Sequence, residues 1–212
     1  LPYDLPDFAS ISDDDFLPAF TEAMASHVAE VEAIAADPSV AEHRDAVERV
    51  FQRLESADWP PLQRVHGDYH LGQVLDVPGR GWVLLDFEGE PLRPLATRNT
   101  PDAPVRDVAG MLRSFDYAAA VGKAPHPDWL PAVRSAFEEG YRLGRQETGS
   151  QDPSPATSST EEQAEASYQT VLTCLELDKA LYEAVYEARN RPDWIEIPLQ
   201  GLRRILDAPA PT

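Results

Sequence analysis

The segment RVHGDYHLGQVLDVPGRGWVLLDFEGEP, residues 64–91, decides how the rest of this chain is interpreted. It places two His, three Asp, one Gln and two Glu around two short apolar runs. The runs QVLDV and GWVLLDF are separated by a turn sequence that contains PGRG, which predicts a β-hairpin. A hairpin brings the residues before its first strand and those after its second strand to the same edge. We therefore expect the polar side chains of this segment to gather at one site.

The sequence on both sides of the hairpin is mainly helical. Apolar residues recur at helical spacing over residues 12–37, 39–57, 105–122, 127–146, 161–191 and 198–206. Residues 89–104 are rich in Pro and Arg and are expected to be irregular, and residues 148–160, TGSQDPSPATSST, are expected to form a flexible surface loop. The predicted fold class is mainly α with a small β-hairpin (α+β), and the 212 residues suffice for one domain or for one lobe of a larger protein.

The overall charge and the cysteine content exclude several function classes. The net charge of −19 disfavours nucleic acid and anionic membranes as partners. The single cysteine, Cys174, excludes a disulfide framework and any metal site of the CxxC type, and it suits the reducing cytoplasm. The chain begins without Met, so we expect it to be a piece of a longer protein.

The spacing of the polar residues in residues 64–91 is that of a phosphoryl-transfer site. His66 and Asp68 are followed, five residues after the Asp, by Gln73, and Asp86 ends the second apolar run. Kinases use the pattern H-x-D-x-x-x-x-N and then, one strand pair later, an Asp that binds the metal. Amide and carboxylate oxygens suit Mg²⁺. The spacing therefore predicts Asp68 as the catalytic base and Gln73 and Asp86 as Mg²⁺ ligands, with ATP as the donor.

A second interpretation of the same residues is a metal-dependent hydrolase. Its ligands would be His66, Asp68, His70 and Asp86. It predicts tight binding of a transition metal and no dependence on nucleotide. The presence of Gln73 at the kinase spacing argues against this interpretation.

Four motifs resemble the aminoglycoside-phosphotransferase-like kinases, and within them most closely the bacterial maltokinases and glucosamine kinases. They are HGDYHLGQVL, LLDFEGEP, RDVAGMLRSFDYAA and LDKALYEAVYEARNRPDWIEIPLQGLRRIL, which together span residues 66–206. The resemblance implies the C-terminal lobe of a protein-kinase-like fold, with ATP, Mg²⁺ and a small sugar as acceptor. It also implies that Glu88 could assist the metal and that His66 and Asp107 order the catalytic loop.

The nucleotide-binding lobe of such a kinase has no counterpart in this sequence. No Gly-rich phosphate loop precedes residue 66, and neither of the two lysines, Lys123 and Lys179, lies on a suitable strand. We therefore expect residues 1–212 to form the C-terminal lobe only and to be nearly inactive in isolation. The alternative is a non-catalytic lobe that docks an enzyme of sugar metabolism.

The acceptor site is expected beside the base and along the helix over residues 161–191. Carboxylates bind sugar hydroxyls, aromatic faces cover sugar rings, and several carboxylates favour a cationic amino sugar. The alternative for the carboxylates is a solvated acidic helix face. These features leave maltose and glucosamine both open as acceptors. The candidate sugar contacts are Tyr69, His70, Asp178, Tyr182, Glu183, Tyr186, Glu187 and Trp194.

Overall fold

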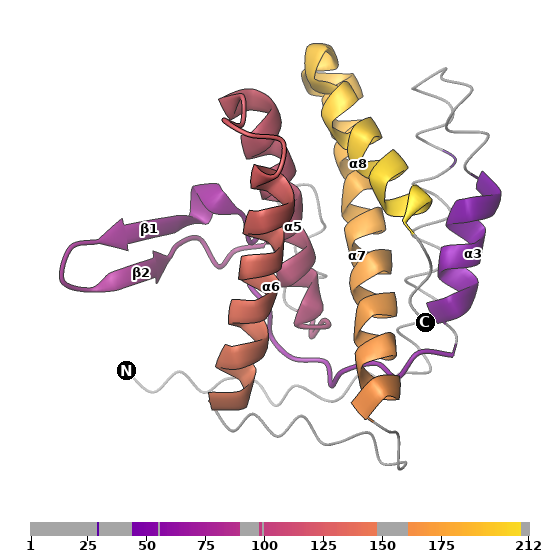
Figure 1. Ribbon diagram of the computed structural model, residues 1–212, viewed down its shortest axis with the longest axis horizontal. Coiled ribbons are helices and arrows are strands. Elements are labelled where there is room, and N and C mark those ends of the chain that lie inside the picture. Colours follow the sequence, from indigo (N-terminus) through magenta and orange to yellow (C-terminus); the bar gives the residue numbers. More distant parts are fainter. Residues whose placement is uncertain are drawn as a thin grey trace.

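The fold is a helical body with a small β-hairpin on one side (Figure 1). The computed structural model describes residues 29, 44–54, 56–89, 98, 100–147 and 161–208. This part of the chain confirms the predicted class of mainly α structure with one hairpin. Its elements in chain order are α3 (Arg44–Leu54), η1 (Leu71–Gln73), β1 (Val74–Val77), β2 (Gly81–Leu84), α5 (Val105–Gly122), α6 (Trp129–Glu147), α7 (Glu161–Asn190), η2 (Pro192–Trp194) and α8 (Glu196–Asp207).

The helix bounds agree with the sequence pattern where they can be compared. The helix predicted over 105–122 is α5, and the one predicted over 161–191 is α7 with a difference of one residue. Helix α8 begins two residues earlier than predicted. The helix predicted over 12–37 and the loop predicted over 148–160 lie outside the described residues, apart from Ala29.

The hairpin that the turn sequence predicts is present. Strands β1 and β2 are antiparallel, with Val74 opposite Leu84 and Val77 opposite Gly81. Gly79 and Gly81 have φ values of +78° and +75°, a region that glycine enters without steric cost. The hairpin points away from the helices, and the Trp82 side chain near its tip is 73% exposed.

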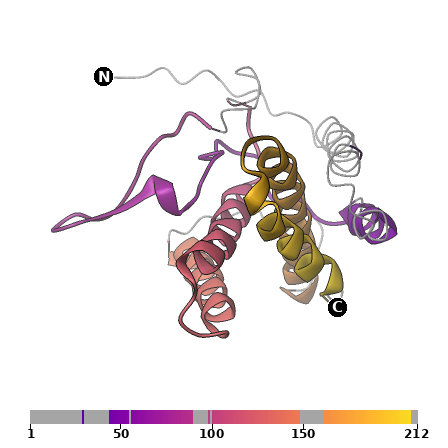
Figure 2. The ribbon, with the colours of Figure 1, turned by 90° about the horizontal axis from the view of Figure 1, so that it is seen from above.

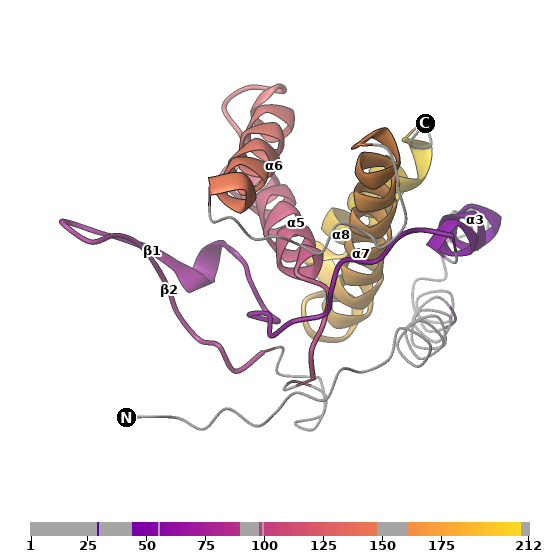
Figure 3. The ribbon, with the colours of Figure 1, turned by 90° about the horizontal axis from the view of Figure 1, so that it is seen from below.

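Helix α7 is the centre of the helical body. It packs against α3, α5 and α8, and Figures 2 and 3 place α3 and the hairpin on opposite sides of it. Its apolar residues share one core with those of the neighbouring helices. Cys174 lies in this core, where burial raises the pKa of its thiol to about 12, so the thiol is inert in the folded chain. None of the described helices is both long enough and apolar enough to cross a lipid bilayer.

An ion-pair network, largely buried, joins helices α5, α6, α7 and α8. Arg113 of α5 is fully buried, and its guanidinium pairs with Asp116 and, at 2.8 Å, with Glu183 of α7. The network contains three arginines and three carboxylates, so its formal charges balance. Its members are Arg113 and Asp116 of α5, Arg134 of α6, Glu176 and Glu183 of α7, and Arg204 of α8.

Glu176 is the point at which α6 and α8 are tied to α7. Its two carboxylate oxygens accept hydrogen bonds from Arg134 at 2.8 Å and from Arg204 at 2.7 Å. These two arginines hold the pKa of the buried Glu176 carboxyl below its usual range even though burial acts in the opposite direction. Removing one partner of such a pair leaves an uncompensated buried charge, which costs about 3–5 kcal/mol.

Gly201 of α8 makes room for this network. A Cβ atom at position 201 would collide with the guanidinium of Arg113. We predict that Gly201→Ala lowers the free energy of unfolding by at least ~1–3 kcal/mol, the usual cost of overpacking a core. Chemical denaturation followed by circular dichroism measures this change.

The matched control for Gly201→Ala is Gly140→Ala on the exposed face of α6. Among the described residues, and apart from the adjacent residues and the backbone of α6 itself, no atom lies within 4 Å of a Cβ built at Gly140. Ala is the better helix former, so this variant should gain up to ~1 kcal/mol. Equal stability of the two variants would show that α8 does not pack on Arg113 as described.

Candidate active site

A single carboxylate ties the loop that contains Asp68 to helix α5. Asp107, in the first turn of α5, accepts hydrogen bonds from the backbone N–H groups of His66 at 2.7 Å and Gly67 at 2.9 Å. Burial raises the pKa of Asp107, and the two backbone donors oppose that shift because they stabilise the ionised form. The helix thus fixes the backbone just before Asp68.

Two glycines allow this loop to pack closely. Gly67 has a φ value of +81°, and a Cβ there would lie 3.3 Å from the Cα atom of Gly89. Gly110 of α5 faces the carbonyl oxygen of Tyr69, which would lie only 2.7 Å from a Cβ at position 110. The loop therefore lies directly against the backbone of α5.

His66 is buried and connects the loop to the residues that follow β2. Its Nδ1 accepts a hydrogen bond from the Asp68 N–H at 3.4 Å, so its Nε2 carries the proton and donates to the carbonyl oxygen of Leu85 at 2.6 Å. The centroid of the His66 ring also lies 4.8 Å from the centroid of the Phe87 ring. Both ring nitrogens of His66 are occupied by the backbone.

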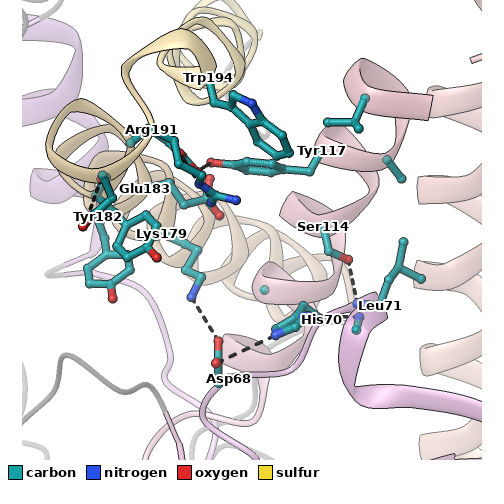
Figure 4. A pocket seen from close by; sticks show the side chains of 17 residues that line it. Asp68, His70, Leu71, Ser114, Tyr117, Lys179, Tyr182, Glu183, Arg191 and Trp194 are labelled. Carbon is teal, nitrogen blue, oxygen red and sulfur yellow. Dashed lines mark hydrogen bonds and ion pairs between the residues drawn. The ribbon is translucent and has the colours of Figure 1, made fainter. Parts of the chain in front are cut away.

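Asp68 reaches a pocket and is flanked there by two nitrogen groups (Figure 4). Its Oδ1 lies 3.5 Å from Nζ of Lys179, and its Oδ2 lies 3.8 Å from Nε2 of His70. The Nδ1 of His70 accepts a hydrogen bond from the Gly72 N–H, so in the neutral ring Nε2 holds the proton that faces Asp68. The Asp68 side chain is 19% exposed, so it is accessible to a small molecule in the pocket.

Gln73 and Asp86 are brought together by the hairpin. The side-chain amide nitrogen of Gln73 donates to the Asp86 carboxylate at 3.2 Å, and the backbone carbonyl of Gln73 accepts a hydrogen bond from the Leu85 N–H at 2.9 Å. Asp86 has a φ value of +58°, an uncommon conformation that recurs at functional sites. An amide and a carboxylate at this spacing fit Mg²⁺, which completes its shell with water and phosphate oxygens. Glu88 is exposed two residues after Asp86.

The pocket beside Asp68 has a volume of about 800 Å³, large enough for a sugar. Its walls come from the loop at residues 68–72, from α5 and α7, and from η2 (Figure 4). Seven of the candidate residues from the sequence line it together: Asp68, His70, Tyr182, Glu183, Tyr186, Glu187 and Trp194.

The carboxylates of α7 are not the solvated face that the sequence left open as an alternative. The Glu187 side chain is 1% exposed, accepts a hydrogen bond from the Tyr117 hydroxyl at 2.9 Å and pairs with Arg191. The Arg191 guanidinium in turn lies 4.5 Å from the centre of the Trp194 ring. Burial, and the carboxylates of Glu183 and Glu187, raise the pKa of Tyr117 far above its usual range, so its hydroxyl stays protonated and donates.

The position of the Glu183 carboxylate is fixed by Arg113 of the buried network. Its Oε2 accepts hydrogen bonds from Nε and Nη2 of Arg113 at 2.9 and 2.8 Å. Burial raises the pKa of Glu183, and the positive charges of Arg113 and Lys179 oppose that shift. A carboxylate fixed in this way at a pocket wall is suited to bind a polar ligand, because little conformational entropy remains to be lost.

Two of the eight candidate sugar contacts, Tyr69 and Asp178, do not line the pocket. Asp178 is buried and pairs with Arg106 at 3.1 Å, and Arg106 also pairs with Asp102. Tyr69 packs against the apolar core, and burial raises its pKa. The structure therefore places neither side chain where it could meet a ligand in this pocket.

Several residues of the pocket wall are not indicated by the sequence pattern. The sequence around Tyr117 indicates only a helix, and the sequence shows of Lys179 only that it does not lie on a strand of a nucleotide-binding lobe. The four-residue spacing between Glu187 and Arg191 is an available signal, because such pairs meet on one helix face. No local pattern links Lys179 to Asp68, which lies 111 residues earlier in the chain. The main residues missed are Ser114, Tyr117, Lys179, Asn190 and Arg191.

Comparison with curated proteins shows similarity to glucosamine kinases from two bacteria. The chain is 31% identical over 175 residues to the glucosamine kinase of Mycolicibacterium smegmatis, a match that covers 77% of this chain and 39% of that protein. It is 28% identical over 165 residues to the glucosamine kinase of Streptacidiphilus jiangxiensis, covering 74% of this chain and 34% of that protein. The chain thus spans well under half the length of these relatives. No protein-family model matches it.

Solved structures of glucosamine kinase share the fold. One crystal form superposes with a TM-score of 0.70 at 25% identity over 90% of this chain and 45% of that chain. A glucosamine kinase in complex with glucosamine, ADP and inorganic phosphate superposes with a TM-score of 0.71 at 23% identity over the same share of this chain. The resemblance that the four sequence motifs indicate is confirmed for the glucosamine kinases, and the helical fold with its hairpin is consistent with a C-terminal lobe.

The anchoring of the loop by Asp107 can be tested without an activity assay. We predict that Asp107→Asn speeds hydrogen exchange at the Gly67 amide by at least ~10-fold, because an amide side chain has one acceptor oxygen where the carboxylate has two. Exchange measured by mass spectrometry on peptides covering residues 64–72 reports this change. The exposed Asp128→Asn is the control, and unchanged exchange in Asp107→Asn would contradict the anchoring.

Proposed function

We propose that this chain is the catalytic and sugar-binding lobe of an ATP- and Mg²⁺-dependent sugar kinase, with glucosamine as the preferred acceptor and maltose as the second candidate. The observation that carries this proposal is the position of Asp68 at the wall of a sugar-sized pocket, in the same loop-and-hairpin unit as the Gln73–Asp86 pair. The similarity to glucosamine kinases supports the same conclusion. Such a kinase would work in the cytoplasm, where ATP is available.

In the proposed reaction Asp68 receives the proton of the acceptor hydroxyl. The hydroxyl oxygen forms a bond to the terminal phosphorus of ATP, the bond from that phosphorus to the bridging oxygen breaks, and ADP leaves with the electron pair. Positioning and charge stabilisation supply most of the rate in reactions of this kind. The backbone contacts of Asp107 and His66 keep Asp68 in place for this step.

Gln73 and Asp86 would hold Mg²⁺, and Glu88 could assist them. In this structure the Gln73 amide points its nitrogen at Asp86, so the amide must turn over to offer its oxygen to a metal. The metal supplies neutralisation of phosphate charge when it is bound. The nucleotide-binding lobe would come from a part of the protein outside residues 1–212.

The acceptor sugar would lie between α5 and α7. Trp194 and Tyr186 offer aromatic faces, and Glu183 offers a fixed carboxylate. Glu187 has both oxygens engaged by Tyr117 and Arg191, so it shapes the wall more than it meets the ligand. The Glu183 carboxylate can accept hydrogen bonds from a hydroxyl or from an ammonium group, and the similarity to glucosamine kinases favours the amino sugar.

The hydrogen bonds of the His66 ring argue against the metal-hydrolase alternative. Both of its ring nitrogens are engaged by the backbone, so it has no free lone pair for a metal. Within the described residues, no group of three or more His, Cys, Asp and Glu side chains is placed to hold a metal ion. The non-catalytic docking lobe remains the second candidate, and it predicts no ATP turnover by the full-length protein.

The decisive experiment measures ADP release by the full-length protein with ATP and Mg²⁺, offered glucosamine and maltose separately. We expect turnover with glucosamine and a loss of at least ~10²-fold in Asp68→Asn, because the base is removed. Residues 1–212 alone are expected to show no turnover. No turnover by the full-length protein with either sugar would contradict the proposal.

The role of Glu183 is tested by the same assay with Glu183→Gln. We expect the KM for glucosamine to rise by ~10–100-fold, the usual loss for a hydrogen bond to a charged group, and the KM for ATP to stay within ~3-fold. The exposed Glu139→Gln on α6 is the control for lost charge. An unchanged KM for glucosamine would remove Glu183 from the acceptor site.

A further inference from the structure

Lys179 of α7 is placed against the carboxylate that we propose as the catalytic base. Its Nζ lies 3.5 Å from Oδ1 of Asp68, and Figure 4 shows the ammonium pointing from α7 across the pocket to the loop. The side chains of Lys179 and Asp68 are 23% and 19% exposed, so the pair is partly shielded from water but open to a ligand. The ammonium also lies 5.2 Å from the centre of the Tyr182 ring.

The use of lysine at this position contrasts with the rest of the chain. Of the 18 Lys and Arg residues only two are lysines, and every cation of the buried network is an arginine. Arginine has a planar fork that suits fixed pairs, whereas lysine is a compact charge with three donors that can redirect. A lysine at the pocket can therefore donate to Asp68 and at the same time to a second acceptor.

The proposed reaction brings two negative groups together at this place, where a cation would lower their repulsion. The Asp68 carboxylate and the incoming phosphoryl group are both negative, and in the proposed step only the acceptor hydroxyl lies between them. Their repulsion is substantial in a site that is partly shielded from solvent. On the described residues that line the pocket, the cation nearest to Asp68 is Lys179, with the His70 ring on the other carboxylate oxygen.

We propose that Lys179 is a second catalytic residue of this site. Its ammonium orients Asp68 and donates a hydrogen bond to the phosphoryl group while that group passes to the acceptor hydroxyl. The proton of that hydroxyl goes to Asp68. Lys179 keeps all its protons throughout, so it stabilises negative charge and transfers no proton. This inference rests on the proposed function, because it needs a phosphoryl donor and an acceptor hydroxyl at Asp68.

Kinetics separate this role from a contact with the sugar. In the full-length protein, Lys179→Met should lower kcat by ~10²–10³-fold, the usual loss when one donor to a developing charge is removed. The KM values for glucosamine and ATP should stay within ~3-fold, and Lys179→Arg should restore part of kcat. Lys123→Met removes the other lysine, which lies exposed at the end of α5, and should leave all parameters unchanged.

Chemical modification of the same two lysines tests the proposal in the wild-type protein, without any substitution. Acetylation of the wild-type full-length protein, followed by mass spectrometry, reports the accessibility of each amine. ADP, Mg²⁺ and aluminium fluoride, which mimic the transferring phosphoryl group, should protect Lys179 and leave Lys123 reactive. Protection by glucosamine alone, with no further effect of the phosphoryl mimic, would assign Lys179 to the sugar instead and overturn the proposal.

The outcomes also distinguish this inference from the proposed function. Turnover by the wild type with kcat of Lys179→Met within ~3-fold would overturn the role of Lys179 and leave the kinase function standing. No turnover by the wild type with either sugar would overturn both. Loss of kcat in Lys179→Met with protection of Lys179 by the phosphoryl mimic would support the assignment.

Discussion

The charge balance of the buried network is the constraint on which the remainder of this structure depends. Helices α5, α6, α7 and α8 each contribute a charged side chain to it, and its buried members, Arg113, Asp116 and Glu176, could not be buried without their partners. The requirement fixes how α7 is rotated about its own axis, because Glu176 and Glu183 must both face arginines of other helices. That rotation then determines which residues of α7 face the pocket.

The same network prepares the pocket for a ligand. Arg113 is buried on the far side of Glu183, and it holds that carboxylate with two hydrogen bonds to one oxygen. A side chain already immobilised by the core loses little entropy when a ligand binds, so stability and recognition draw on one set of contacts. Gly201 of α8 belongs to this arrangement although it lies away from the pocket, because its missing Cβ leaves space for Arg113.

A second unit holds the proposed chemical groups in place. Asp107 and Gly110 of α5 hold the loop against the helix, one through two hydrogen bonds from backbone N–H groups and the other through close contact with the Tyr69 carbonyl. The hairpin extends from this loop and returns Asp86 to the side of Gln73. The candidate reaction centre therefore lies where a loop anchored on α5 meets the central helix α7.

The sequence by itself determined the hairpin, the helical class and the local spacing of His66, Asp68, Gln73 and Asp86. These features depend on residues close together in the chain, whose turn chemistry and periodicity are visible without a fold. Seven residues that line the pocket were also visible in the sequence. Tyr182, Glu183, Tyr186 and Glu187 repeat along one helix, and Asp68, His70 and Trp194 lie in the motifs.

Only the tertiary structure decided which carboxylates of α7 face the pocket and which are paired elsewhere. Asp178 and Glu183 look alike in the sequence, yet one pairs with Arg106 and the other lies at the pocket wall. The pairing of Lys179 with Asp68 joins residues far apart in the chain, and it exists only because α7 packs against α5 and the loop anchored on it. Partners of buried charges are chosen by packing between helices, and no periodicity within one helix encodes that choice.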